Sequence, residues 1–120
     1  MEILAIFNKA ARVEILLTNS IITNFNMQLN EIADTHYAWL KEMGWTKATP
    51  LESLALITSE VGEAVNECRK GEPTPEFGTE LADIVLRVLG LAKHHNINLE
   101  EVIEKKMTIN RMRGNRGRTI

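Results

Sequence analysis

Two helix-start signals constrain the fold of this chain most strongly. Thr49 and Thr74 are each followed by a proline, the arrangement of a helix N-cap with proline at the first helical position. The first signal predicts a helix that ends near Gly71, and the second predicts a helix that frays around residues 94–96. Because the turn between them, residues 71–74, is so short, we expect two antiparallel helices lying side by side.

Helical patterns on either side of this hairpin complete the chain. A helix is predicted from about Gln28 to Met43, and a last helix from an Asn98 cap to about Arg113; each ends before a glycine. Few stretches alternate between apolar and polar residues, so no strands are expected. The sequence therefore predicts an all-α, four-helix bundle-like domain over residues 27–120.

The segment of residues 1–26 permits two interpretations. It is either an extra helix or an N-terminal extension outside the domain. Its apolar stretch at residues 15–22 resembles a signal peptide weakly, but Glu14 and the lack of a small-residue cleavage site argue against export.

The composition indicates one ordinary globular domain. A chain of 120 residues, 44% hydrophobic and 25% charged, is long enough for a single core. No run of about 20 apolar residues is present, so no membrane partner is expected. The single cysteine excludes a disulfide within the chain and fits a cytoplasmic location. The net charge of −2 gives no general bias toward nucleic acid.

Each of the two central helices carries one pair of acids at i,i+3 spacing. The pairs are Glu60 with Glu63, and Glu80 with Asp83. This spacing places both carboxylates of a pair on one helix face. Four such groups in a small volume repel one another unless a cation lies between them. Mg²⁺ prefers oxygen ligands of this kind, often with substrate phosphates. The alternative is a pair of solvated acidic faces, which are common on helices.

The position of the acids relative to the apolar pattern favours the metal site. At about 100° per residue, both pairs lie off the same edge of the apolar stripe of their helix. Arg87, four residues after Asp83, is expected to form an ion pair with it along the helix. The residues expected to face the core are Leu54, Ile57, Val61, Ala64, Val65 and Cys68 in the first helix, and Phe77, Leu81, Ile84, Val85, Val88, Leu89 and Ala92 in the second.

These motifs resemble the signature of the MazG-like family of all-α nucleoside triphosphate pyrophosphohydrolases. That signature is an ExxE pair, a linker and an ExxD pair on the next helix. Here it is read in residues 59–64 and 79–85. The resemblance extends upstream to the Gly-Trp segment at residues 41–45 and downstream to a Lys-x-x-x-Asn-x-x-Arg arrangement at residues 106–113. It covers roughly residues 28–118.

The resemblance implies Mg²⁺-dependent hydrolysis of ribo- or deoxyribonucleoside triphosphates to monophosphate and pyrophosphate, with Mn²⁺ as a substitute metal. It is consistent with housecleaning of the nucleotide pool, and it implies a homodimer or homotetramer. Glu60, Glu63, Glu80 and Asp83 are the expected metal ligands. Glu63 is also the favoured acceptor of the proton from water.

The last predicted helix offers a phosphate clamp. Lys106, Asn110 and Arg113 are spaced by four and then three residues, so they share one helix face. A lysine, an amide and a guanidinium suit a polyphosphate well. The alternative is a solvated basic terminus, since the chain from Lys105 onward has six basic residues and no acidic one. In that case the protein would be a non-catalytic helical module for nucleic acid or an acidic partner, although nucleic acid is not the expected partner.

Two aromatic residues are candidates for holding the nucleobase. His36 and Trp45 can stack on a base or bond to it. Trp39, at helical spacing with apolar neighbours, is expected to belong to the core. His94 and His95 are expected at a helix end, about three turns from the acids.

Overall fold

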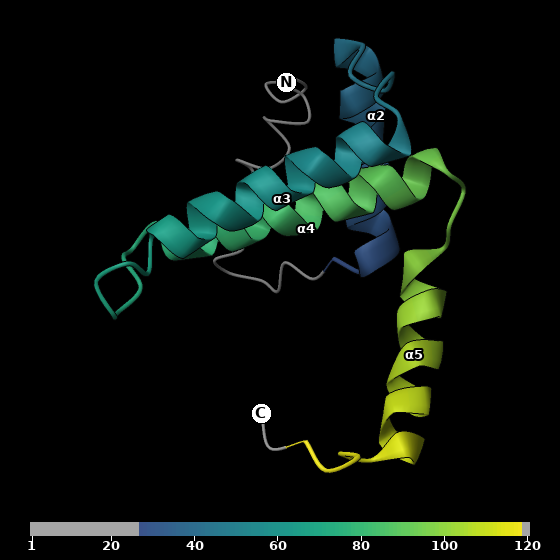
Figure 1. The fold of residues 1–120 in the computed structure, drawn as a ribbon. Helices are drawn as coiled ribbons and strands as arrows, with labels where there is room; N and C mark the ends of the chain where they lie inside the picture. Colours follow the sequence, from purple (N-terminus) through teal and green to yellow (C-terminus); the bar gives the residue numbers. More distant parts are fainter. Residues whose placement is uncertain (1–26, 119–120) are drawn as a thin grey trace, which may run out of the picture.

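The computed structural model describes residues 27–118, and this part of the chain consists of four α-helices without strands. The helices are α2 (Leu29–Met43), α3 (Pro50–Asn66), α4 (Phe77–His94) and α5 (Leu99–Arg113) (Figure 1). The all-α prediction is confirmed. The interpretations of residues 1–26 lie outside the described residues.

Local capping chemistry fixes most helix ends where the sequence predicted them. The Thr49 hydroxyl accepts a hydrogen bond from the Glu52 N–H, and the Glu52 carboxylate accepts one from the Thr49 N–H, each at 3.1 Å. Asn98 caps α5 by accepting from the Glu101 N–H at 3.2 Å. α2 ends at Gly44, whose φ of 75° lies in the left-handed region that favours glycine. These bonds satisfy backbone groups that a helix terminus leaves free.

Two predicted boundaries at the hairpin turn are wrong. α3 ends at Asn66 rather than near Gly71, and α4 begins at Phe77 rather than directly after Thr74. The cause is that Thr74 bonds back to the end of α3. Its N–H donates to the Glu67 carbonyl at 3.0 Å, and its hydroxyl donates to the Glu67 carboxylate at 2.5 Å. The connection is therefore longer than predicted, but α3 and α4 still form an antiparallel pair (Figure 1).

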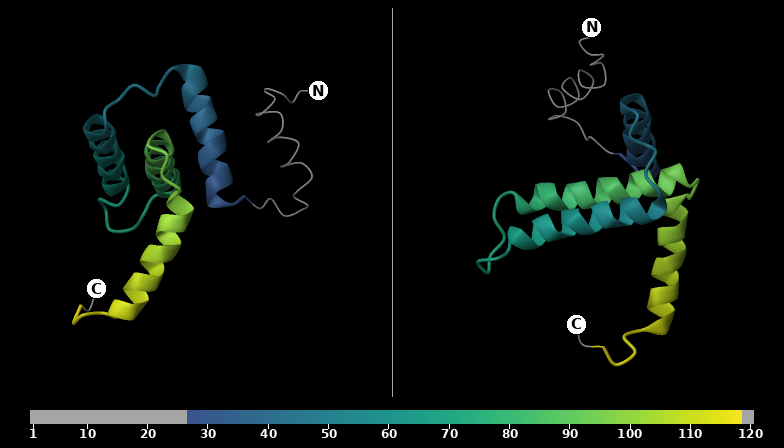
Figure 2. Two further views of the ribbon diagram at one scale, coloured as in Figure 1. Left: turned by 90° about the vertical axis from the view of Figure 1, so that its right-hand side faces the viewer. Right: turned by 45° about the horizontal axis from the view of Figure 1, so that its top comes forward.

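α4 is the central helix of the fold. It packs against α3 on one side and α2 on the other, and these two helices do not contact each other (Figure 2). α2 approaches α4 closely at Gly90, where a Cβ would lie 2.9 Å from Cδ1 of Leu40. α5 contacts α2 and α4 but not α3, and it projects away from the hairpin (Figure 1).

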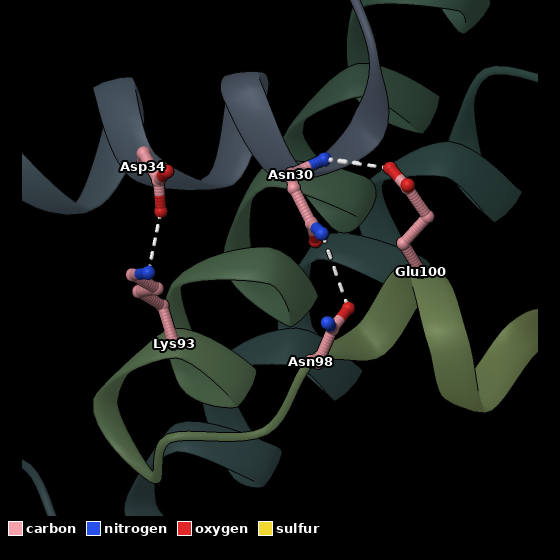
Figure 3. Close-up of polar contacts among 5 residues, drawn as sticks. All are labelled: Asn30, Asp34, Lys93, Asn98 and Glu100. Carbon is pink, nitrogen blue, oxygen red and sulfur yellow. Dashed lines mark hydrogen bonds and ion pairs between the residues drawn. The ribbon is translucent and has the colours of Figure 1, made fainter.

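Polar side chains join the start of α2 to the junction of α4 and α5 (Figure 3). The Asn30 N–H donates to the Glu100 carboxylate, and its side-chain amide donates to Oδ1 of Asn98, both at 3.1 Å. One turn further along α2, Asp34 forms an ion pair with Lys93 of α4 at 2.5 Å. These contacts fix where α5 leaves the body of the protein.

Many apolar side chains predicted to face the core are exposed instead. The buried hydrophobic residues are Ala33, Ala64, Leu89 and Ala92. α4 contacts all three other helices, whereas α3 contacts α4 alone, so α3 keeps an uncovered face. On the hairpin this exposed apolar face consists of residues that are 42–63% exposed: Leu54, Val61, Val65, Leu81 and Val85.

The described helices include none that is long and apolar enough to cross a bilayer.

Candidate functional site

Three of the four predicted acids come together between α3 and α4. Glu60 and Glu63 extend from α3 and Glu80 from α4, and each offers a carboxylate oxygen within 4.8 Å of the others. We call these three residues the acid cluster. Asp83, one turn after Glu80, contributes its charge to the surroundings and lines the adjacent cavity. The packing of α3 on α4 thus brings Glu60, Glu63 and Glu80 together, and Asp83 does not belong to this group.

Glu80 is the most perturbed member of the cluster. Its Oε1 is shielded from solvent and has no hydrogen-bond partner among the described residues. Burial raises the pKa of Glu80, and the neighbouring Glu63 carboxylate raises it further, with smaller effects from Asp83 and Glu67. A carboxylate oxygen without a partner, close to other carboxylate oxygens, is a suitable ligand for a hard divalent cation. Such a cation would give this oxygen a partner and would neutralise the negative charge of the cluster.

Arg87 pairs with the acid cluster rather than with its neighbour along the helix. Its Nε donates to Oε2 of Glu60 at 2.6 Å, so the predicted pair with Asp83 is wrong. The reason is the packing of α3 on α4, which brings residues 27 positions apart side by side. The Glu60 side chain is 15% exposed and that of Arg87 is 42% exposed.

A cavity of about 780 Å³ opens beside the acid cluster. It lies over α4, between α2 with its following segment and α3. Its wall is mainly aromatic and apolar, with charged residues where it meets the acids. It is lined by His36, Tyr37, Trp39, Leu40, Gly44, Trp45, Thr46, Lys47, Ala48, Ser53, Leu56, Glu60, Asp83, Leu86, Arg87, Gly90, Leu91 and His94.

The two predicted base-binding residues both line this cavity. Trp45 is 59% exposed, and its ring packs edge-to-face on that of Trp39, with 5.3 Å between the ring centroids and 85° between the ring planes. His36 lies 5.9 Å from Trp39, centroid to centroid. Burial lowers the pKa of His36, and the charge of Arg87 lowers it further, so the neutral ring is favoured. The prediction that Trp39 belongs to the core is wrong, because it is 42% exposed and lines the cavity.

Sequence reasoning missed one end of the cavity wall. His94 ends α4 as predicted, but it also lines the cavity, and its Nδ1 is hydrogen-bonded to the Tyr37 hydroxyl at 2.7 Å. A signal was present in the sequence. Asp83, Arg87, Gly90 and His94 follow one another at spacings of four, three and four, which is one face of a helix.

The predicted phosphate clamp lies on α5, which contacts α4 and α2 but not α3, the helix that carries Glu60 and Glu63. Lys106, Asn110 and Arg113 are exposed on α5, which does not contact α3. Asn110 and Arg113 do share a helix face, since Nη2 of Arg113 donates to Oδ1 of Asn110 at 3.4 Å.

The chain matches a known protein family. The family model of the MazG nucleotide pyrophosphohydrolase domain matches residues 48–114, which is more than half of the chain. The match spans α3, α4 and α5 and includes all four acids. No curated protein and no solved structure matches the chain. The acid cluster, the helical hairpin and this match agree, and the chain belongs to the MazG nucleotide pyrophosphohydrolase family.

Proposed function

We propose that this protein is a Mg²⁺-dependent hydrolase that cleaves ribo- or deoxyribonucleoside triphosphates to monophosphate and pyrophosphate. The observation that carries the proposal is the position of the acid cluster at the edge of an aromatic cavity, with Glu60 belonging to both. A nucleotide has this same division, with an aromatic base at one end and a polyanion at the other. Family membership supports the reaction class.

Each acid has a role that follows from its surroundings. Glu60, Glu63 and Glu80 would hold the cation, and Asp83 would add negative charge or a further ligand. When bound, the cation supplies charge neutralisation for the phosphates and lowers the pKa of a water molecule. Glu63 is exposed, whereas Glu60 and Glu80 are partly buried. Water therefore reaches the Glu63 carboxylate most easily, and we assign it the role of proton acceptor.

The nucleobase would occupy the cavity. Trp45 and Trp39 present aromatic surface there, and base–aromatic stacking contributes about 1–3 kcal/mol per base. A neutral His36 ring has one nitrogen that donates and one that accepts, so it can bond to a polar edge of the base.

A second copy of the chain would complete the site. The proposed clamp, Lys106, Asn110 and Arg113, lies on α5, which does not contact α3, and the hairpin leaves an exposed apolar face. Burying that face between copies favours association. We therefore propose a homodimer or homotetramer in which α5 of one copy supplies phosphate ligands to another.

The test is a panel of ribo- and deoxyribonucleoside triphosphates, including modified bases, assayed for pyrophosphate and monophosphate together. We expect equal amounts of both products with Mg²⁺, retained turnover with Mn²⁺ and none with EDTA. Preference for modified nucleotides would support a role in nucleotide-pool housecleaning. Folded protein that hydrolyses nothing in the panel but binds nucleic acid through α5 would contradict the proposal and favour a non-catalytic binding module.

A further inference from the structure

Arg87 forms an ion pair with the acid cluster. Among the described residues 27–118, its contact with Glu60 is the only ion pair that involves the acid cluster, since the other pairs join Lys93 to Asp34 and Lys105 to Glu101. Arg87 thus supplies a direct counter-charge to the cluster.

The same guanidinium also faces the cavity. Arg87 lines the cavity wall beside Asp83, and only its Nε is engaged, with Glu60. Within the described part of the chain its two terminal nitrogens donate no hydrogen bond. A planar fork with free donors, 42% exposed at a cavity wall, is suited to a second anion.

The pairing with Glu60 opposes cation binding. A guanidinium next to a carboxylate repels a divalent cation bound to that same carboxylate, because both groups are positively charged. A phosphate entering the site removes this conflict, because it gives the guanidinium another partner. The cation then increases the affinity for the nucleotide, and the nucleotide increases the affinity for the cation by the same factor.

We propose that Arg87 is a positioning residue that alternates between two anions. It holds Glu60 while the acid cluster is without a cation, and it binds the triphosphate of the substrate once Glu60 has become a metal ligand. The inference rests on the proposed function. Its consequence is that the cation alone binds weakly, while cation and nucleotide strengthen each other's binding.

The experiment compares Arg87→Gln with Lys93→Gln, which removes the same charge from another ion pair on the same helix. Mn²⁺ binding is measured by electron paramagnetic resonance without nucleotide, and binding of inorganic tripolyphosphate is measured by calorimetry in saturating Mg²⁺. In Arg87→Gln we expect Mn²⁺ to bind roughly tenfold more tightly and tripolyphosphate roughly tenfold more weakly. Lys93→Gln should change neither affinity.

A second variant, Arg87→Lys, keeps the charge and loses the fork. It should bind Mn²⁺ about as the unmodified protein does and tripolyphosphate with intermediate affinity. Unchanged or weaker Mn²⁺ binding in Arg87→Gln would overturn the inference, as would unchanged tripolyphosphate binding. If the unmodified protein itself takes up no Mn²⁺, the proposed function fails as well. If the unmodified protein and all variants bind Mn²⁺ with equal affinity, the inference about Arg87 is wrong but the proposed function still stands.

Discussion

Glu63 on α3 and Glu80 on α4 face each other across the hairpin, with carboxylate oxygens within 4.8 Å. Their proximity adds to the effect of burial, and together these raise the pKa of Glu80. The folded chain therefore holds a proton at Glu80 more tightly than the unfolded chain does.

The first prediction concerns stability against pH in EDTA. A raised pKa in the folded state gives stability that is present below the unfolded pKa, about 4.3, and lost as pH rises through the folded value. At pH 7, Glu80→Gln should therefore have a higher Tm than the unmodified protein, and the difference should shrink as the pH falls to about 4. Thermal denaturation at a series of pH values measures this difference in Tm. The control is Glu72→Gln, a substitution at an exposed position between α3 and α4. A lower Tm for Glu80→Gln throughout would contradict the pKa assignment.

The second prediction concerns the proposed proton acceptor. Glu63→Gln should reduce kcat by about 10²–10⁴-fold, because the amide cannot take up a proton. Its Tm should not fall, since Glu63 is exposed. Steady-state kinetics with a matched Glu72→Gln preparation separates loss of chemistry from loss of protein. Retained turnover in Glu63→Gln would move the role to another acid.

The third prediction concerns metal linkage. A ligand that binds only the folded state at 100 times its Kd stabilises by about 2.7 kcal/mol. Mg²⁺ should therefore raise the Tm of the unmodified protein, and EDTA should reverse the rise. Glu80→Gln should show little response, because it lacks one charged ligand of the cluster. An equal rise in both proteins would place the cation elsewhere.

The fourth prediction concerns the floor of the cavity. Gly90→Ala places a methyl group 2.9 Å from Leu40 and 3.7 Å from His36, both of which line the cavity. Since Leu40 can shift and alanine favours a helix by about 1 kcal/mol, stability should change little. KM should rise several-fold at constant kcat. Gly78→Ala, in the same helix with nothing near its Cβ, is the control and should leave KM unchanged.

The fifth prediction tests whether sites are shared between copies. Glu63→Gln and Arg113→Ala should each be nearly inactive alone. If α5 serves another copy in a dimer, statistical mixing after unfolding and refolding should restore about a quarter of the activity, because half the dimers carry one intact site. Mixtures that remain inactive would show that α5 acts on its own chain.

Features set by neighbouring residues were predictable from the sequence. The caps at Thr49 and Asn98 and the stop at Gly44 depend on bonds within a few positions, and all three lie where predicted. The i,i+3 spacing likewise predicts that the acids of each pair share one helix face, whereas the meeting of Glu60, Glu63 and Glu80 depends on the packing of α3 on α4.

Features that depend on how helices pack were not predictable in this way. The partner of Arg87 is Glu60, 27 positions away, and the nearer Asp83 offered an equally reasonable pair along the helix. Trp39 was expected in the core because apolar spacing identifies a face without saying what covers it. Leu54 and Val65 were misplaced for that reason, since α3 has a neighbour on one side only.

Because α4 separates α2 from α3, the acid cluster and the aromatic side chains of the cavity lie on different helices. The acid cluster belongs entirely to α3 and α4, whereas Trp39 and His36 belong to α2. A small swing of α2 would alter the room for the base while leaving the carboxylates undisturbed. Under the proposed function, substitutions on α2 would therefore change which nucleotide binds and leave the carboxylates of the acid cluster in place.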